Sequence, residues 1–332
     1  MKNYLILFLF ICLVAVACSK ENSDLFVLYP GNPANDTTWS SSLSANSSAN
    51  TLFDALAFAP FVDSFSVTGS ALFHVSASLD VAIPASCITN ANGSPVTPGK
   101  VRVEIRHVLR RGDFIRYARP TTTYGKLMES GSVFEIKFFR KDQELALQTD
   151  KKLILTLKDP DPVNNMSVFF GTVSPQPPFP VGTNPFFAWA TSIDSSFVTT
   201  FVHHDSTGTT KGYQLFVGKT NWINCQVPFD NAQPKTNITF TLPPNFTNKN
   251  TAVFAVVKQR KIIVQLNGDV ASRSFFAPNI PVGTAIQMVT LSLIGNQYYL
   301  GFKEANVSQD FIGIINPASK SMAEISRFLS GL

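Results

Sequence analysis

The sequence predicts a mostly β protein with two antiparallel β-sandwich-like domains and a short C-terminal helix. Short segments in which apolar and polar residues alternate recur along most of the chain, as expected for strands with one buried face. Turn-forming pairs such as Asn92-Gly93 and Tyr124-Gly125 separate these segments at a spacing typical of sandwiches. A helical pattern with capping residues appears at the end of the chain.

The N-terminal segment has the organisation of a signal peptide. Lys2 gives a positive start, an apolar run ends at Ala17, and Ala15 and Ala17 are the small residues that a cleavage site requires. The run is shorter than the roughly 20 apolar residues of a membrane-spanning helix. We therefore expect residues 1–17 to be removed by cleavage before Cys18.

The residues at the expected cleavage site predict a lipid anchor. Ala15-Val16-Ala17-Cys18 resembles the lipobox of bacterial lipoproteins, in which the cysteine thiol receives a diacylglyceryl group before cleavage. It departs from the commonest form in having Ala15 where leucine is usual, and the alternative is an ordinary signal peptide followed by a cysteine. Because each buried methylene of an acyl chain contributes ~0.8 kcal/mol, two or three chains would hold the protein stably on a membrane.

The residues after Cys18 indicate which membrane. Lys20-Glu21 resembles the surface-export signal of Bacteroidota-type lipoproteins. We expect an outer-membrane location, and the cell surface is favoured over the periplasmic side.

Residues 18–51 are predicted to form a Ser/Asn-rich tether behind the anchor. The stretch "NPANDTTWSSSLSANSSAN" is typical of it, and such a composition buries too little apolar surface to fold alone. Trp39 and the apolar stretch from Leu25 to Pro30 are the parts that could dock on neighbouring structure.

Residues 52–174 are predicted to form the first β-sandwich. In "KVRVEIRHV", from Lys100 to Val108, the valines and the isoleucine fall on one face and charged residues on the other. The stretches "SVFEIKFF" and "KLILTLK" repeat this alternation. We expect an antiparallel sandwich built from such strands.

A proline cluster at 175–185 is predicted to be a linker, because prolines cannot donate backbone hydrogen bonds to a sheet. Residues 186–332 then form the second β-rich domain. It ends in a helix whose capping box is Ser321 with Glu324. The apolar face of that helix consists of Met322, Ile325, Phe328 and Leu329.

Composition limits the classes of function. The chain has 332 residues with a formal net charge of +5 and only 15% charged residues, and it shows no basic run with interleaved aromatics. We therefore expect no nucleic-acid partner. Of the cysteines that remain after cleavage, Cys87 and Cys225 could form a disulfide in an oxidising envelope, but buried free thiols are the favoured interpretation.

Two stretches resemble a known group of proteins. The run from Leu79 to Ile136, with "IPASCITNANGSPVTPGKVRVEI" and "PTTTYGKLMESG", resembles a module of uncharacterised Bacteroidota lipoproteins. That module is distantly similar to the β-sandwich shared by ankyrins, zonula-occludens proteins and netrin receptors. "GYQLFVGKTNWINC" and the stretches that follow it resemble the domain that often comes next. The resemblance implies binding or scaffolding sandwiches without a catalytic motif.

Histidines and carboxylates are the candidate metal ligands of this chain. Adjacent strand residues point to opposite faces, so His203-His204-Asp205 is expected to be a polar strand end and no metal site is predicted. His74 and His107 stand alone in strand contexts. The stretch from Asp159 to Pro162 offers oxygen ligands for calcium, but the prolines favour a strand-ending turn.

Arginines concentrate in the first domain. Arg111-Gly112-Asp113 matches a tripeptide that adhesion receptors recognise, but a turn with Gly112 at positive φ is the favoured interpretation. The surrounding positive charge is a candidate anion-binding patch for lipid phosphates or an anionic glycan. A solvated face, partly neutralised by acidic neighbours, explains the charge equally well. The candidate patch consists of Arg102, Arg106, Arg110, Arg111 and Arg116, with Arg119 nearby.

The sequence selects no catalytic residues and no cofactor. A Gly-x-Ser-x-Gly elbow is absent, and nothing singles out a serine or a carboxylate pair. We expect a non-catalytic, membrane-anchored protein that binds an envelope protein or a glycan. The alternatives are a secreted hydrolase or polysaccharide-processing accessory, and an assembly partner of an outer-membrane transporter.

Overall fold

The computed structural model divides into two compact units, Met1–Asp36 and Thr37–Leu332. The predicted signal peptide, Cys18 and the proline-rich segment at 175–185 lie outside the described residues. In the first unit the description covers a short 3-10 turn, η2 (Pro33–Asn35). The structure describes residues 32–43, 47–123, 125–174, 186–192, 195–206, 208–229 and 232–332.

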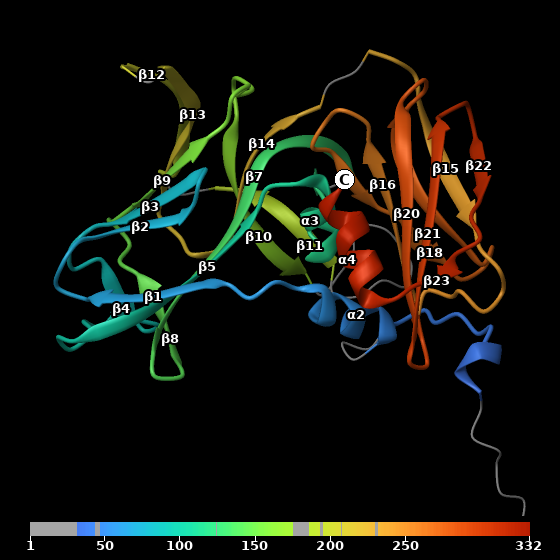
Figure 1. Ribbon diagram of the computed structural model, residues 1–332, viewed down its shortest axis with the longest axis horizontal. Helices are drawn as coiled ribbons and strands as arrows, with labels where there is room; N and C mark the ends of the chain where they lie inside the picture. The colour runs from blue at the N-terminus through green and yellow to red at the C-terminus, as the bar shows by residue number, and fades with distance from the viewer. Residues whose placement is uncertain are drawn as a thin grey trace, which may run out of the picture. The chain divides into compact units, whose positions relative to one another are not determined.

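The predicted mostly β fold is confirmed, and two sheets of the second unit form a first sandwich. We call them sheet 1 and sheet 2 (Figure 1). The main path of sheet 1 consists of β1 (Phe61–Ser66), β5 (Lys100–Val108), β7 (Lys126–Arg140), β14 (Asn221–Pro228), β10 (Ser167–Ser174) and β11 (Phe186–Thr191), with β4 (Ile88–Asn90), β6 (Thr122–Thr123) and β8 (Gln143–Leu147) at its margins. Sheet 2 consists of β12 (Phe197–Asp205), β13 (Gly208–Val217), β9 (Leu153–Lys158), β3 (Leu79–Ile83) and β2 (Ala71–Ser76).

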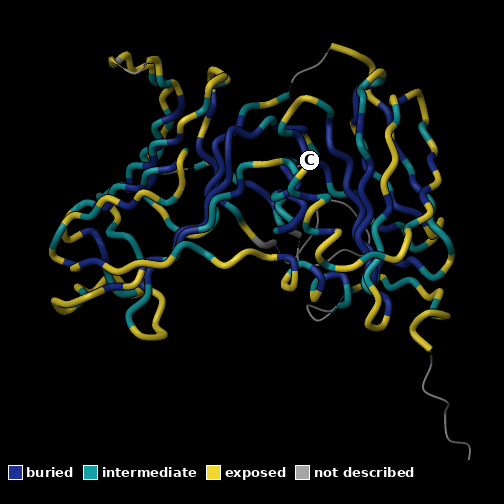
Figure 2. The backbone as a smooth tube through the Cα atoms, viewed as in Figure 1, coloured by how far each residue is buried: buried dark blue, intermediate teal, exposed yellow. Residues whose placement is uncertain are grey.

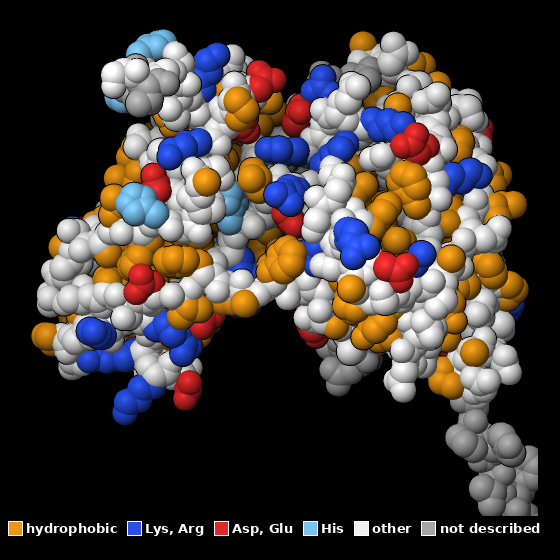
Figure 3. Space-filling model, in the orientation of Figure 1, with side chains coloured by type: hydrophobic (Ala, Val, Ile, Leu, Met, Phe, Trp, Pro, Cys, Tyr) orange, Lys and Arg blue, Asp and Glu red, His pale blue; other side chains and the backbone are white. Residues whose placement is uncertain are grey.

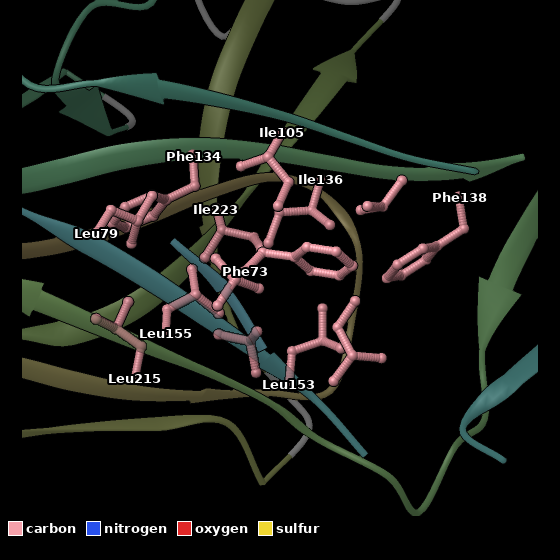
Figure 4. Packing of buried hydrophobic residues seen from close by; sticks show 14 of the residues in the cluster. Phe73, Leu79, Ile105, Phe134, Ile136, Phe138, Leu153, Leu155, Leu215 and Ile223 are labelled. Atoms are coloured by element: carbon pink, nitrogen blue, oxygen red, sulfur yellow. The ribbon is translucent and has the colours of Figure 1, made fainter. Parts of the chain in front are cut away.

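The core of this sandwich is made by alternate residues of the two sheets. In β5 the residues Val101, Val103 and Ile105 are buried while Arg102 and Glu104 face outward, as the alternation predicts. Figure 4 shows Ile105 of β5 among other side chains of this core, such as Leu155 of β9 and Ile223 of β14. The buried free thiols of Cys87 and Cys225 belong to the same cluster, which confirms the favoured interpretation.

Two further sheets form a second sandwich, with mainly aliphatic residues between them. The pairing of β15 with β22 is parallel, unlike the antiparallel pairing that the sequence predicts. Sheet 3 consists of β18 (Asn267–Asp269), β19 (Ser274–Pro281), β15 (Lys235–Thr241) and β22 (Phe311–Ile314). Sheet 4 consists of β17 (Ile263–Gln265), β16 (Thr251–Val257), β20 (Ala285–Ile294), β21 (Gln297–Asn306) and β23 (Ala318–Ser319).

The sheets do not divide at the predicted boundary. Strands β13 and β14 follow the segment 175–185, yet β13 pairs with β9 and β14 pairs with β7, both of which precede it. The first sandwich therefore continues to Pro228, and residues 52–174 and 186–332 are not separate folding units. Prolines predict a local loss of backbone donors, but they carry no information about which distant strands pair.

In the described part of the second unit, three α-helices lie between the two sandwiches (Figure 1). They are α2 (Ser48–Leu56), α3 (Arg111–Arg116) and α4 (Met322–Ser330). Leu52, Phe114 and Ile325 of these helices share one buried cluster with Val133 of sheet 1 and Val289 of sheet 4. Figure 2 shows the buried segments continuing from one sandwich through this region into the other.

The C-terminal part of the predicted tether, residues 37–51, is docked in the described positions. Trp39 packs against Phe275 with ring centroids 5.0 Å apart. The side chain of Asn248 accepts from the backbone N–H of Ser40 and donates to its carbonyl. Helix α2 also begins inside this segment and buries three apolar side chains. The prediction that Trp39 could dock is confirmed, and a tether up to residue 51 is wrong for these positions, because Trp39 and the apolar side chains of α2 pack on the sheets.

The expected turn at Arg111-Gly112-Asp113 is the first turn of helix α3. Gly112 is not among the glycines with positive φ. A Cβ at Gly112 would clash with the carbonyl oxygen of Leu329 in α4, so glycine is required for the close approach of α3 and α4. The tripeptide is therefore a helix contact, and Gly112 itself is buried.

The predicted capping box of the last helix is confirmed. The Ser321 hydroxyl accepts from the Glu324 N–H at 3.2 Å, and a Glu324 carboxylate oxygen accepts from the Ser321 N–H at 2.8 Å. Ile325 and Leu329 are buried in the contact between the sandwiches. The helix thus joins the sandwiches as well as ending the chain.

We predict that Gly112→Ala lowers the free energy of unfolding by about 2 to 3 kcal/mol, because the added methyl group overpacks the contact between α3 and α4. Urea denaturation followed by circular dichroism measures the change. Gly69→Ala is the matched control, since a Cβ there meets its nearest atom at 3.7 Å, and its effect should stay within about 0.5 kcal/mol. Equal losses in the two variants would contradict the close approach.

Candidate functional site

The arginines of the predicted anion-binding patch are not brought to one surface. Arg116 is 1% exposed, and its guanidinium donates to the Leu56 carbonyl at 2.9 Å and to the Ser326 carbonyl at 3.2 Å. The Nε of Arg111 donates to the Leu332 carbonyl at 2.7 Å. Arg116 therefore holds helices together and is not exposed to a ligand, and Arg111 contacts Leu332, which follows α4.

The other arginines of the patch lie on the outer face of β5 or at the start of α3. A guanidinium nitrogen of Arg102 lies 3.2 Å from a carboxylate oxygen of Glu104, and Arg106 forms an ion pair with Glu135. Arg110 is the N-cap residue of α3, where its backbone N–H donates to the Asp113 carboxylate at 3.1 Å. On the face shown in Figure 3, lysines and arginines stand beside acidic residues and do not form a continuous basic surface. This arrangement agrees with the alternative of a partly neutralised, solvated face.

An ion cluster around the buried Glu135 lies where the outer face of sheet 1 approaches α3. Glu135 is 5% exposed and contacts both Arg106 and Lys137, the latter at 3.1 Å. Cross-strand register brings Arg106, Glu135 and Trp222 side by side on β5, β7 and β14. Glu135 therefore has both of its oxygens paired, while the two cations and one carboxylate leave a net charge of +1 in the cluster.

Arg119 extends the ion cluster across aromatic rings. Its guanidinium carbon lies 4.3 Å from the ring centroid of Phe187 and 4.3 Å from that of Trp222. Burial lowers the pKa of Arg119 to about 10, while the nearby Glu135 opposes this shift. The sequence did not select Glu135, and only strand pairing places Glu135 and Trp222 beside the arginines.

The "WINC" stretch that the resemblance singled out has a structural role on both faces of β14. Ile223 and Cys225 enter the core of the first sandwich. Asn224, on the other face, accepts from the Ser130 hydroxyl at 2.6 Å and donates to Gln226 at 2.8 Å. The motif therefore satisfies buried polar groups next to a packed core.

A Ser–His contact occurs in the first sandwich, but it is not arranged for nucleophilic catalysis. The Nε2 of His107 is 2.9 Å from the Ser132 hydroxyl, which donates to the Val108 carbonyl at 3.0 Å. The serine proton therefore points away from the imidazole, and Ser132 is fully buried. Burial, and to a lesser degree the charge of Lys261, lowers the pKa of His107 to about 4.

The remaining sequence candidates occupy ordinary structural positions. The described residues contain no group of three His, Cys, Asp or Glu side chains that could hold a metal ion. His204 contacts Thr209 at 2.9 Å near the end of the β12–β13 hairpin. At the turn considered for calcium, the Asp159 carboxylate accepts from the backbone N–H of Asp161. Its other oxygen lies 3.5 Å from the Nζ of Lys261, so a lysine is the cation beside this carboxylate.

The buried thiols of Cys87 and Cys225 are poor nucleophiles. Burial raises the pKa of each thiol to about 11, which leaves almost no thiolate at neutral pH.

The outer face of sheet 2 is the surface that sequence analysis missed. Cross-strand pairing aligns Leu72, Ala82, Ile154, Phe216 and Phe197 in one row that crosses all the strands of the sheet. Leu72 is 58% exposed and Phe197 is 45% exposed, so the two ends of the row are open to solvent. Within the described residues, the cluster that joins the sandwiches covers sheet 1 and includes none of the strands of sheet 2.

A polar row runs beside this apolar row on the same face. Strand pairing aligns His74 with Asp80, Asp80 with Thr156, and so on to the far edge of the sheet. The alternation along each strand could have shown outward positions, but not which residues of different strands become neighbours. The polar row consists of His74, Asp80, Thr156, Gln214 and Thr199.

Comparison with known proteins adds no family to this geometry. No protein-family model matches the chain, and a search of curated proteins found no match. Among the described residues, no helix has the length and apolar character needed to cross a membrane.

We predict that the partly buried imidazole of His107 makes the fold less stable in acid. The unfolded chain binds a proton near pH 6.5, whereas folded His107 binds one only near pH 4, so stability falls as the pH drops through this interval. Protonation of His107 is expected to lower the free energy of unfolding by about 2 kcal/mol between pH 7 and pH 4.5.

Urea denaturation of the wild type and His107→Gln at both pH values measures this loss. The advantage of the wild type over the variant should shrink by that amount in acid. His204→Gln, which changes an exposed histidine, should keep the pH dependence of the wild type. The same pH dependence in the wild type and His107→Gln would contradict the prediction.

Proposed function

We propose that the chain is a lipid-anchored lipoprotein of the outer membrane with a non-catalytic binding role, exposed at the cell surface. The anchor is Cys18, supported by the Ala15-Val16-Ala17-Cys18 pattern and the signal-like residues before it. The contact surface is the outer face of sheet 2.

The binding role is supported by the alignment of outward-facing side chains in rows across the strands of sheet 2. Exposed apolar residues are normal when they are scattered, but here Leu72 and Phe197 are the exposed ends of one apolar row, partly buried between them, that crosses five strands. A second row of hydrogen-bonding groups accompanies it. A rigid sheet that presents both kinds of group holds them in place without ordering a loop on binding.

The buried polar groups of the first sandwich favour a structural interpretation over a hydrolase. Ser132 directs its hydroxyl proton at the Val108 carbonyl. Glu135 is committed to Arg106 and Lys137. A hydrolase would need a carboxylate or hydroxyl that faces solvent beside a group able to exchange a proton with it.

Cys18→Ala is predicted to release the protein from the membrane fraction, because the thiol that receives the acyl chains is lost. Fractionation with mass spectrometry of the mature N-terminus measures this, and globomycin should leave the wild type uncleaved. Cys12→Ala is the matched control, since Cys12 lies in the part that is removed, and this variant should stay lipidated. A Cys18→Ala protein that stays on the membrane with unchanged mass would overturn the anchor.

The binding role predicts contact through sheet 2 in living cells. A photoreactive p-benzoylphenylalanine at Thr199, on the polar row, should form a covalent adduct with a cell-envelope macromolecule on irradiation. The control places the same residue at Phe302 on β21, which is 44% exposed and lies on the other sandwich. Adducts at neither position, or equal adducts at both, would contradict sheet 2 as the contact surface.

A further inference from the structure

The two rows on sheet 2 allow the class of ligand to be inferred. The apolar row runs across the strands, and four strand-to-strand intervals of about 4.8 Å make it about 19 Å long. The inward neighbours of these residues, such as Val81, Leu155 and Leu215, fill the sandwich core. The row is therefore fixed on a packed sheet and cannot collapse inward.

Aromatic rings form one end of the apolar row. The rings of Phe197 and Phe216 are nearly parallel, with centroids 4.5 Å apart and an interplanar angle of 16°. The Nζ of Lys152 lies 5.0 Å from the centroid of the Phe197 ring. Phe197 still exposes nearly half of its surface, so part of the ring remains available to a ligand.

The polar row supplies donors and acceptors and little net charge. Its two ionisable side chains pair with each other, because the Nδ1 of His74 is 2.7 Å from an Asp80 carboxylate oxygen. Thr156, Gln214 and Thr199 add hydroxyl and amide groups. On β9, Lys158 follows the polar row, and Lys152, just before the strand, lies beside the apolar row.

We propose that this face binds one strand of a neutral polysaccharide, laid across the strands of sheet 2. A sugar chain has apolar C–H faces that pack on Leu72, Ile154 and the aromatic pair. Its hydroxyl groups lie at the edges of the rings, where the parallel polar row can donate to them and accept from them. The near-neutral rows favour an uncharged ligand over a polyanion.

A folded protein partner fits this face less well. A protein interface of standard size buries about 800 Å² per partner around an apolar centre surrounded by a polar rim. Here the apolar groups form a single narrow row with hydrogen-bonding groups directly beside it. This shape matches a linear chain of repeating units.

Isothermal titration calorimetry of the full-length protein in non-ionic detergent tests the proposal. The probes are hydroxyethylcellulose, galactomannan, xylan and dextran, with polygalacturonate as the anionic comparison. We expect binding to at least one neutral polymer. Phe197→Ala and Gln214→Ala should each weaken that binding by about tenfold, the effect of losing one aromatic or hydrogen-bond contact.

Phe302→Ala is the matched control. Phe302 is 44% exposed against 45% for Phe197, and each ring packs on one other phenylalanine. The control should bind as the wild type does, and thermal unfolding should show that the variants remain folded. Binding to none of the neutral polymers, binding to polygalacturonate alone, or equal loss in Phe302→Ala would overturn the proposal.

This inference rests on the binding role proposed above, and different experimental results would overturn the polysaccharide ligand and the binding role. If the photoreactive residue at Thr199 captures an envelope protein while no neutral polymer binds, the polysaccharide is overturned and the binding role stands. If it captures nothing and no polymer binds, both are overturned. The calorimetry needs no membrane, so its outcome does not depend on lipidation at Cys18.

Discussion

The guanidinium of Arg116 is the interaction on which the arrangement of the two sandwiches depends. It lies between three helices and donates to the carbonyl of Leu56 at the end of α2 and to Ser326 in α4. Asp113 on its own helix supplies a nearby negative charge at 3.7 Å. Burial lowers the pKa of Arg116, and these partners offset the cost of holding a charge away from water.

This helical contact determines which surfaces of the sheets remain open. The helices and sheet 4 cover part of the outer face of sheet 1, and Glu135 there is buried and paired with cations. The outer face of sheet 2 belongs to the same sandwich but lies outside this contact. The contact between the sandwiches thus covers one face of the first sandwich and leaves the face of the proposed binding surface outside it.

Local patterns predicted much of the fold. The alternation in β5 placed Val103 inside and Glu104 outside, and the capping box placed the start of α4 at Ser321. These predictions succeed because each depends on residues within one turn or one strand. The turn expected at Gly112 failed for the opposite reason, since the atom that requires a glycine is the carbonyl of Leu329, which is distant in sequence.

The sequence by itself determined the mostly β class, the outward and inward positions of the strands and the final helix, because hydrophobic period and capping are local. The tertiary structure alone decided that β9 pairs with β13 and that Arg116 is a buried clamp instead of part of an anion patch. It alone aligned Leu72 with Phe197 across five strands. Strand order and register come from long-range pairing, and no local pattern carries that information.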